Sequence, residues 1–551
     1  MAARTSSTSK AKQYRAEAIA IIKKHRSELN AEKAKYLYGS GKPLERRKKL
    51  FHISTLQVDG EELEDQEQWE VPLRKFLEAK YGCSKDEERL PIMQWALADE
   101  GQICLDNSTL LEASFRIRRK NKLDSYGMTP LILHLAITAT CKAANWFSEL
   151  VSSPLFFSRM AVPCHVFSKV GTISPIGKTR MVFPLPVLLQ LADVVLSTAL
   201  DQLLTERFAY SIEEPFFHGG VRYSQPLDLT FAMAQTIEKG IDSKSMGSVA
   251  QCDIRCYYDE VSVTSLAASL DDDTIPSSLL RSLVMLQMLP IVQVHCGVVS
   301  FQLRHRTVGA LTGSRSAGQL ARVPVADVFR RLRGRVTGTI IPSVGLMSWI
   351  DNIIALADSP TSAVYLIEQV EDLLKSRWNL HIKESSKELL VAKGCPVQFA
   401  LQDGWSQTDE LASLGDIISN DMSPHPLLKQ AEVKSWAAFW RNSGSSLARH
   451  LTVTQRVKQN QKMVWPCYAH CISRVPPSKS NLTRIQQHQN KMTKIMLQEW
   501  PRSDESPETF VTRVNASISY LKRSVSWSKL VVKNTTSWRD HLLRPNNYCT
   551  R

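Results

Sequence analysis

The chain has 551 residues, enough for roughly two to four structural units, and a formal net charge of +15. Hydrophobic residues make up 43% and charged residues 22%, which is ordinary for a soluble globular protein. The excess of basic residues favours a polyanionic partner, and nucleic acid is favoured over a membrane surface. The alternative is a basic soluble protein with no such partner.

The chain has eleven scattered cysteines and no visible signal peptide, which predicts a reduced compartment, nuclear and/or cytoplasmic. We therefore expect a protein that is neither secreted nor transmembrane. The apolar run at 181–204 contains Pro184, Pro186, Gln190 and Asp193, so we expect a buried strand and helix there, not a membrane span. The cluster at 467–471 lacks a second ligand pair at zinc-finger spacing, so we interpret it as structural.

Residues 1–50 are strongly basic, with a net charge of about +10. They indicate a nucleic-acid-binding arm, in which residues 46–49 could also direct nuclear import; a solvated, partly disordered terminus is the alternative. Residues 72–112 have helical composition and show no sign of chemistry. We therefore treat residues 1–114 as a basic N-terminal extension, partly disordered or helical.

Two cation-bearing segments come next. Residues 115–127 form a basic loop that suits contact with a nucleic-acid backbone, although a plain surface loop has the same composition. Residues 166–184 alternate as strand, turn and strand, with Lys169 and Arg180 at the rims.

Two carboxylates come at the ends of predicted strands. An apolar lead-in at 249–252 delivers Asp253 to the tip of one strand. The stretch 345–357 is apolar on both sides of Asp351 and Asn352, which predicts a β-hairpin with Asp351 at its tip. Together they could hold Mg²⁺, which takes one or two protein carboxylates and leaves its other positions to phosphates and water.

The remaining elements are a helix at 186–208, a loop of small residues at 309–318 that runs into a helix at 319–332, and a helix at 363–378. Amphipathic helices are predicted at 427–440 and 452–471, and a basic helix at 480–497. The tail pairs Trp538 with basic residues, which can stack on bases but is more simply a packed helix.

Residues 253–259 resemble motif A of reverse transcriptases, Asp-Ile-x-x-[Ala/Tyr]-[Phe/Tyr]-Asp, and residues 349–352 resemble motif C, [Phe/Tyr]-x-Asp-Asp. In the order of that family, residues 166–184 resemble the fingers hairpin, 309–318 motif B, 380–390 motif D and 411–418 motif E. The basic segment at 115–127 and the ending at 538–544 are similar to those of LINE-type (non-LTR) retrotransposon reverse transcriptases.

This resemblance implies an α+β protein with the right-hand polymerase fold: fingers, an antiparallel palm and a helical thumb, with helical N- and C-terminal extensions. Fingers and palm would span residues 115–420, the thumb 421–500 and a C-terminal tail 501–551. The implied activity is RNA-directed DNA synthesis, with an RNA template, a DNA primer or target and dNTPs as partners. The implied cofactor is Mg²⁺ or Mn²⁺.

The resemblance also implies a role for each matching residue. Asp253, Asp351 and Asn352 would form the catalytic set, with the carbonyl of Ile254 as an extra metal ligand. Tyr258 would lie under the sugar and reject a 2′-hydroxyl, and Lys387 would donate a proton to pyrophosphate. Nucleotide contacts would come from Lys169, Arg180, Tyr258, Gly313 and Lys387, and a primer grip from Leu414 and Gly415.

Some positions depart from the family. Asn352 replaces an aspartate and removes one negative charge, which predicts weak or Mn²⁺-preferring activity. The sequence shows neither an endonuclease before 115 nor a ribonuclease H pattern after 420, so a separate endonuclease or a longer parent protein is expected. The alternatives are a degenerate nucleic-acid-binding protein and an RNA-dependent RNA polymerase, against which Tyr258 argues.

Overall fold

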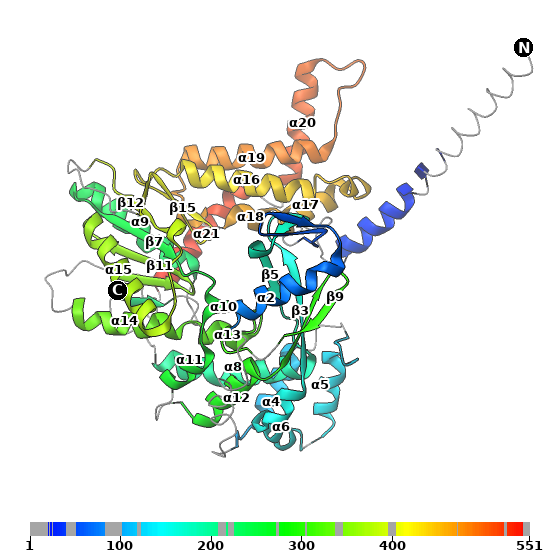
Figure 1. Ribbon diagram of the computed structural model, residues 1–551. Helices are drawn as coiled ribbons and strands as arrows, with labels where there is room; N and C mark the ends of the chain where they lie inside the picture. Colours follow the sequence, from blue (N-terminus) through cyan, green and yellow to red (C-terminus); the bar gives the residue numbers. More distant parts are fainter. Residues whose placement is uncertain are drawn as a thin grey trace, which may run out of the picture. The chain divides into compact units, whose positions relative to one another are not determined.

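The computed structural model divides the chain into two compact units (Figure 1). One unit comprises Lys48–Asp409 with Arg551, and the other comprises Met1–Arg47 with Glu410–Thr550. The structure describes residues 20, 23–24, 26–39, 51–82, 102–117, 123–140, 142–207, 216–218, 225–270, 275–303, 306–336, 345–394, 404–470, 472–522 and 526–543.

The unit Lys48–Asp409 contains a six-stranded sheet with strand order β13-β12-β7-β11-β10-β6. Strand β7 is antiparallel to both of its neighbours, β11 and β12. Its first five residues are buried because helices α9 and α15 pack against the sheet, which explains the unbroken apolar lead-in to Asp253. The strands are β6 Phe216–His218, β7 Ser248–Asp253, β10 Gly345–Trp349, β11 Asn352–Ala357, β12 Glu388–Val391 and β13 Ser406–Thr408.

Helix α15 (Pro360–Trp378) shows how the sequence sets the bounds of an element. The side chain of Ser359 accepts a hydrogen bond from the backbone of Ser362, and Pro360 occupies the first turn. Asn379 ends the helix in the left-handed conformation. The predicted helix at 363–378 is therefore confirmed, with one further turn at its start.

A second sheet of four strands has the order β5-β3-β8-β9. Along β3, buried and more exposed side chains alternate, so one face packs into the core and the other is open. The strands are β3 Ala161–Ser168, β5 Thr179–Val182, β8 Ile291–Cys296 and β9 Val299–Gln302. A small sheet with the order β2-β1-β4 completes this part, with β1 Thr55–Val58, β2 Glu61–Leu63 and β4 Ile173–Pro175.

Helices fill the rest of this unit around one core. The predicted single helix at 319–332 is wrong: it is two helices that break at Ala321 and Arg322, just before Pro324. The helices are α2 Glu70–Lys80, α4 Asn107–Ile117, α5 Pro130–Thr138, α6 Ala143–Ser152, α7 Pro154–Arg159, α8 Val187–Arg207, α9 Pro226–Ser243, α10 Tyr257–Glu260, α11 Val263–Leu270, α12 Ser277–Met288, α13 Arg315–Leu320 and α14 Val323–Val336, with short 3-10 turns η1 Gln66–Trp69, η2 Ile176–Lys178 and η3 Glu384–Ser386.

The other unit is a helical assembly with one hairpin. Helices α16 and α19 run side by side (Figure 1), joined by an ion pair between Arg484 and Glu432 (2.7 Å). Helical residues 26–39 pack Ala34 onto Leu447 and Leu451. Its elements are β14 Glu410–Ser413, β15 Asp416–Ser419, α16 His425–Arg441, α17 Val453–Met463, α18 Trp465–Ala469, α19 Lys479–Leu497, α20 Pro507–Lys522 and α21 Trp527–Leu542, with 3-10 turns η4 Leu447–His450 and η5 Ile472–Arg474.

This division differs from the predicted one. Residues from Lys48 onward belong to the unit of the predicted fingers and palm, because side chains such as Trp69 and Leu73 lie in its core. The boundary between the units falls at Asp409 and Glu410, about ten residues before the predicted one. None of the helices that the structure describes is long and apolar enough to cross a membrane.

Candidate active site

The strand ends that carry Asp253 and Asp351 meet at one edge of the six-stranded sheet. In the antiparallel register of β7 and β11, Asp253 lies opposite Asn352. The backbone N–H of Ile254 donates a hydrogen bond to the carbonyl oxygen of Asp351 (2.8 Å). Because directly paired residues project from the same face of a sheet, the side chains of Asp253 and Asn352 share one face.

Asp351 occupies a two-residue turn between β10 and β11. Its neighbour in the turn, Ile350, has a φ of 61°, a conformation that is strained for a β-branched residue. The paired strands on both sides hold this turn, and the Ile350 side chain packs against the hydrophobic core. The hairpin therefore fixes the backbone that carries Asp351.

The environment of the two carboxylates disfavours their ionised forms. Burial raises the pKa of Asp253, and the positive charge of Lys383 opposes that rise. Burial also raises the pKa of Asp351, and the negative charge of Asp253 adds to the effect. Two half-buried carboxylates that repel each other gain most from a bound cation.

The backbone of Asp253 is held from its other side by the segment before β12. The N–H of Asp253 donates to the hydroxyl of Ser386 (2.9 Å), and the N–H of Lys383 donates to the carbonyl of Asp253 (2.9 Å). The N–H of Arg255 continues this pattern by donating to the carbonyl of His381 (2.8 Å). Asp253 is thus bracketed by the two segments that resemble motifs C and D.

The negative charge of Asp351 acts on the phenol of Tyr258. Burial raises the pKa of the Tyr258 phenol, Asp351 raises it further, and Arg322 opposes the change. The Tyr258 hydroxyl is 4.0 Å from the position that a Cβ on Gly318 would take. The preceding Tyr257 is buried instead, with its hydroxyl donating to a backbone carbonyl in the core. The aromatic pair is therefore divided between the core and the site.

Asp259 connects this site to helix α2. The ammonium of Lys80 is 2.9 Å from the Asp259 carboxylate, and the hydroxyl of Tyr81 donates to the same carboxylate (3.1 Å). The side chains of Lys80 and Asp259 are 15% and 20% exposed, so this ion pair is mostly shielded from water. The stretch at 72–112, whose sequence shows no sign of chemistry, therefore supplies a cation to the site.

Lys169 and Arg180 lie in the same neighbourhood as Lys80. Arg180 is the register partner of Phe167 across β5 and β3, and the N–H of Lys169 donates to the carbonyl of Lys178 (3.0 Å). Burial lowers the pKa of Lys169, and the charges of Lys80 and Arg180 lower it further. A lysine whose pKa is lowered by two neighbouring cations marks a favourable site for an anion such as a triphosphate.

Gly313 lies in a loop whose backbone is held by buried polar side chains. Its φ is 106°, which favours glycine. At the start of α13, the carboxylate of Asp193 accepts hydrogen bonds from the N–H groups of Arg315 (2.6 Å) and Ser316 (3.0 Å). Gln287 donates to the hydroxyl of Ser316 (2.9 Å) and so fixes the same turn. The loop is therefore a preorganised element.

Lys387, the predicted proton donor, is held in ion pairs. Its ammonium is 2.9 Å from Glu371 and 3.0 Å from Glu384. Burial by itself lowers the pKa of Lys387, but hydrogen bonds to the two glutamates outweigh burial, so the pKa is raised. The cation that acts on Asp253 is Lys383, four residues earlier. Lys383 is therefore a second lysine of this segment whose charge acts on the site.

Leu414 and Gly415 form the turn of the β14–β15 hairpin, which belongs to the helical unit. Both have positive φ, 50° and 89°. His470 packs on this turn, with Nε2 3.3 Å from the carbonyl oxygen of Leu414. A Cβ on Gly415 would come within 2.7 Å of the His470 ring, so this position requires glycine for space as well as for conformation.

The donors at the sheet edge fit a magnesium-type ion. Within the described ranges there is no group of three or more His, Cys, Asp or Glu side chains suited to hold a metal, as a structural zinc site would need. Mg²⁺ and Mn²⁺ prefer oxygen donors, and Mg²⁺ needs only one or two carboxylates when phosphates and water supply the rest. Asp253 and Asp351 provide such a pair.

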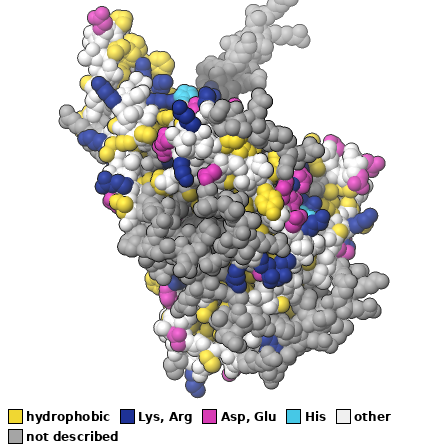
Figure 2. Space-filling view, turned by 90° about the vertical axis from the view of Figure 1, so that its left-hand side faces the viewer, with side chains coloured by type: hydrophobic (Ala, Val, Ile, Leu, Met, Phe, Trp, Pro, Cys, Tyr) yellow, Lys and Arg dark blue, Asp and Glu magenta, His cyan; other side chains and the backbone are white. Residues whose placement is uncertain are grey.

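Charge elsewhere is mixed. Figure 2 shows Lys and Arg side chains interspersed with Asp and Glu over the face that it presents. Several predicted features fall outside the described residues: the basic run at 46–49, residues 118–122 of the basic loop, Cys471 and Arg544.

Sequence reasoning missed Lys80, Asp193 and Lys383. Asp193 had a visible signal, since it is an acidic residue within the apolar run at 181–204. Lys383 lies four positions before the expected Lys387, within the segment that the motif match located. Lys80 had no local signal, because its partner Asp259 is remote in the chain.

Comparisons with known proteins add little to this geometry. The chain matches no protein-family model and no curated protein. Among solved structures, the telomerase from Candida albicans in complex with a fragment of telomeric RNA aligns with a TM-score of 0.35 and 10% sequence identity, over 71% of this chain and 69% of that one. The chain is a mixed α+β protein, and its function has to be inferred from its own residues.

Proposed function

We propose that the chain is an RNA-directed DNA polymerase of the LINE type with a right-hand polymerase fold. The observation that carries the proposal is the register that brings Asp253 on β7 beside Asp351 in the β10–β11 turn and Asn352 at the start of β11. Two carboxylates from strands far apart in the sequence, meeting at one sheet edge, are what metal-dependent nucleotidyl transfer requires.

Asp253 and Asp351, with the carbonyl of Ile254, would hold Mg²⁺ or Mn²⁺, and the bound ion would supply Lewis-acid activation of the primer 3′-hydroxyl and neutralisation of triphosphate charge. The residues of the chain orient the substrates. Lys169 and Arg180 would bind the triphosphate, with Lys80 as a third cation in the same neighbourhood.

Selection and positioning fall to neighbouring residues. Tyr258, half-buried beside Asp351, would lie under the sugar and exclude a 2′-hydroxyl. Gly313 would let the loop before α13 approach the nascent base pair. Lys387 would give a proton to the leaving group, and Lys383, whose charge acts on Asp253, is a second candidate for that role. Leu414 and Gly415 would hold the primer end.

The partners of this activity are an RNA template, a DNA primer and dNTPs, with a separate endonuclease to supply the primer end. A second candidate is a nucleic-acid-binding protein without polymerase activity. Asn352 favours this second candidate, because an amide opposite Asp253 removes one negative charge from the metal site.

Primer extension tests the proposal. The purified chain is given a labelled DNA primer on an RNA template, with dNTPs or rNTPs, and Mg²⁺ or Mn²⁺. We expect extension with dNTPs, faster with Mn²⁺ than with Mg²⁺. Extension with rNTPs alone would identify an RNA polymerase instead. Tight binding without extension under any condition would leave the binding protein.

A further inference from the structure

The open face of the four-stranded sheet carries an array of aromatic rings, three of them histidines. His165 on β3 and His295 on β8 are register partners, and their rings stack with centroids 5.4 Å apart. The Phe167 ring is 6.3 Å from His165 and 5.3 Å from His52. The four rings form a continuous row that we call the histidine array.

Alternation along the strands places the array on the side away from the core. Val162, Cys164 and Val166 are buried, whereas His165 is exposed and Phe167 is half-buried. The register extends this face with polar side chains that can bind bases or phosphates. These are Arg180 opposite Phe167, Ser300 opposite His295, and Gln302 opposite Gln293.

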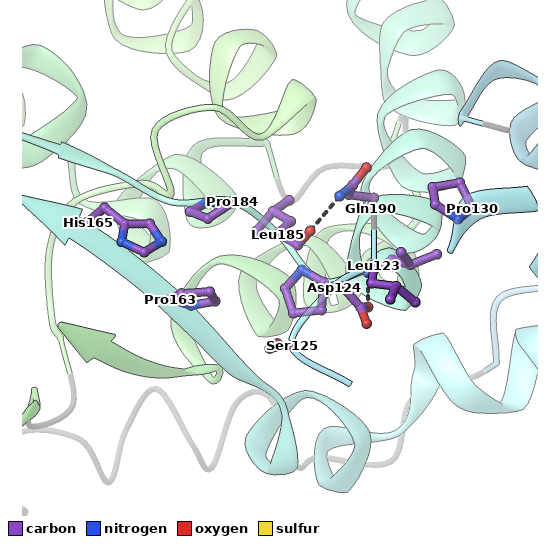
Figure 3. A pocket seen from close by; sticks show the side chains of 11 residues that line it. Leu123, Asp124, Ser125, Pro130, Pro163, His165, Pro184, Leu185 and Gln190 are labelled. Carbon is purple, nitrogen blue, oxygen red and sulfur yellow. Dashed lines mark hydrogen bonds between the residues drawn. The ribbon is translucent and has the colours of Figure 1, made fainter. Parts of the chain in front are cut away.

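A pocket adjoins the array at His165. Its cavity volume is about 790 Å³, within the range of pockets that hold small molecules. Its walls are largely apolar, from Leu123, Pro163, Pro184 and other side chains (Figure 3). Asp124 also lines it, but its carboxylate accepts hydrogen bonds from backbone N–H groups, including that of Val187 (2.8 Å).

The charged groups around the array are mostly cations. The histidines are His295 from β8 and His52 from the segment before β1. The other cations are Arg180 from β5, with Lys169 and Lys178 from the turn between β3 and β5. The acidic group is Asp124, from the loop beside the pocket. Strand β9 contributes the neutral Ser300, whose hydroxyl is 3.2 Å from Nδ1 of His295. Burial lowers the pKa of His165, and the neighbouring histidines lower it further.

We propose that the histidine array binds single-stranded nucleic acid and takes up a proton when it does so. Bases would stack on the rings, phosphates would lie near Arg180 and the imidazoles, and the pocket would accept one unstacked base. The inference rests on the proposed function for the class of ligand. The inference goes beyond the proposed function because binding of nucleic acid at the array requires neither a metal ion nor a dNTP.

The sign of the proton linkage is set by the charges. Without ligand, burial and the positive charge of the neighbouring histidines hold the pKa of His165 below its usual value. A bound phosphate backbone favours the imidazolium and raises the pKa in the complex. Affinity must therefore rise as the pH falls through the interval between the bound and free pKa values, by up to about tenfold per pH unit for each proton taken up.

Fluorescence anisotropy with a labelled single-stranded oligouridylate tests this at pH 7.5 and 5.5 and constant ionic strength. The full chain carrying Asp253→Asn is used without metal, so that failure of the polymerase proposal does not affect the outcome. We expect binding about tenfold tighter at pH 5.5 than at pH 7.5. With His165→Gln and His295→Gln added, the gain should fall below about twofold, and binding at pH 7.5 should weaken because two stacking rings are lost.

The matched control is His425→Gln, which removes an exposed histidine of the helical unit and should leave the pH dependence intact. An unchanged pH dependence in the double variant would overturn the proposal. Equal gains for duplex RNA and the single strand would overturn the stacking geometry. If the double variant has a lowered melting temperature, the pH dependence of binding is measured with His295→Gln alone, because His295 does not line the pocket.

Discussion

Asn352 lies directly opposite Asp253 in the antiparallel ladder of β11 and β7. A carboxylate at position 352 would therefore place a third negative charge at a sheet edge where Asp253 already raises the pKa of Asp351. The amide keeps an oxygen donor and spares the metal-free protein that repulsion. If the proposed metal site exists, Asn352 should bind a divalent cation more weakly than an aspartate would and should cost the metal-free protein less.

Asn352→Asp should increase the affinity for Mg²⁺ and lower the stability of the metal-free protein. One added charge close to the ion predicts about a tenfold fall in the Mg²⁺ concentration at half-maximal extension, which corresponds to about 1.4 kcal/mol. The exposed Asn515→Asp, in the helical unit, is the control and should change neither quantity. Identical Mg²⁺ curves for wild type and Asn352→Asp would contradict this prediction.

Asp351→Asn should raise the melting temperature in EDTA at pH 7. A carboxyl whose pKa is raised in the folded state binds its proton more tightly there than in the unfolded state. Stability therefore falls as the pH rises from the unfolded pKa of Asp351 to its folded pKa. Removing the charge removes the penalty and also removes the stabilisation by Mg²⁺. Thermal melts with EDTA and with Mg²⁺ measure both, with the exposed Asp372→Asn as control. Equal melting temperatures in EDTA would refute the repulsion.

Tyr258→Val should relax sugar selection. With the ring gone from beside Asp351, rNTP incorporation relative to dNTP should rise about tenfold or more. Tyr258→Phe is the matched control, because it keeps the ring that excludes the 2′-hydroxyl. The ratio is measured by single-nucleotide addition. Tyr258 has no selective role if the ratio is the same in all three proteins.

Asp259→Asn should destabilise the protein by about 1–3 kcal/mol, because the shielded Lys80 loses its partner. Glu112→Gln removes an exposed ion pair with Arg116 and should change stability by less than about 0.5 kcal/mol. Urea unfolding followed by circular dichroism compares the two. Equal effects would mean that Asp259 does not fix α2 to the site.

His488 should make the helical unit sensitive to acid. Burial lowers its pKa to about 4, and its Nε2 is 2.7 Å from the Ser435 hydroxyl. Because the folded pKa lies below the unfolded value, stability is full above about pH 6.5 and falls as the pH drops toward 4. Tryptophan fluorescence reports this, since Trp436 and Trp527 pack on His488. His488→Gln should flatten the pH dependence; an unchanged acid transition would exclude His488 as its source.

Local patterns predicted the elements that carry the site. The apolar lead-in to Asp253 became β7, and the two apolar arms around Asp351 became β10 and β11. Both depend on neighbouring residues alone, as does the helix predicted at 186–208, which is α8. The predicted helices that were wrong are divided near a proline. The helix predicted at 452–471 ends at Met463, and a second begins at Trp465 with Pro466 in its first turn.

Contacts between distant segments were not predictable from periodicity. Lys80 and Tyr81 both bind Asp259, although 178 positions separate Tyr81 from Asp259, and nothing in either segment indicates the other. The charge effect of Lys383 on Asp253 was likewise not visible in the sequence, because it depends on the segment before β12 lying beside β7. Tertiary geometry decides both.

Single-nucleotide addition with the two carboxylate variants tests the central claim most directly. A labelled DNA primer on an RNA template receives one dNTP and Mn²⁺ with the wild type, Asp253→Asn, Asp351→Asn and the surface control Asp372→Asn. We predict addition by the wild type and the control and at least about a 100-fold loss in each of the other two, as expected when a metal ligand is removed. Addition that survives in either carboxylate variant would contradict a shared metal site at this sheet edge.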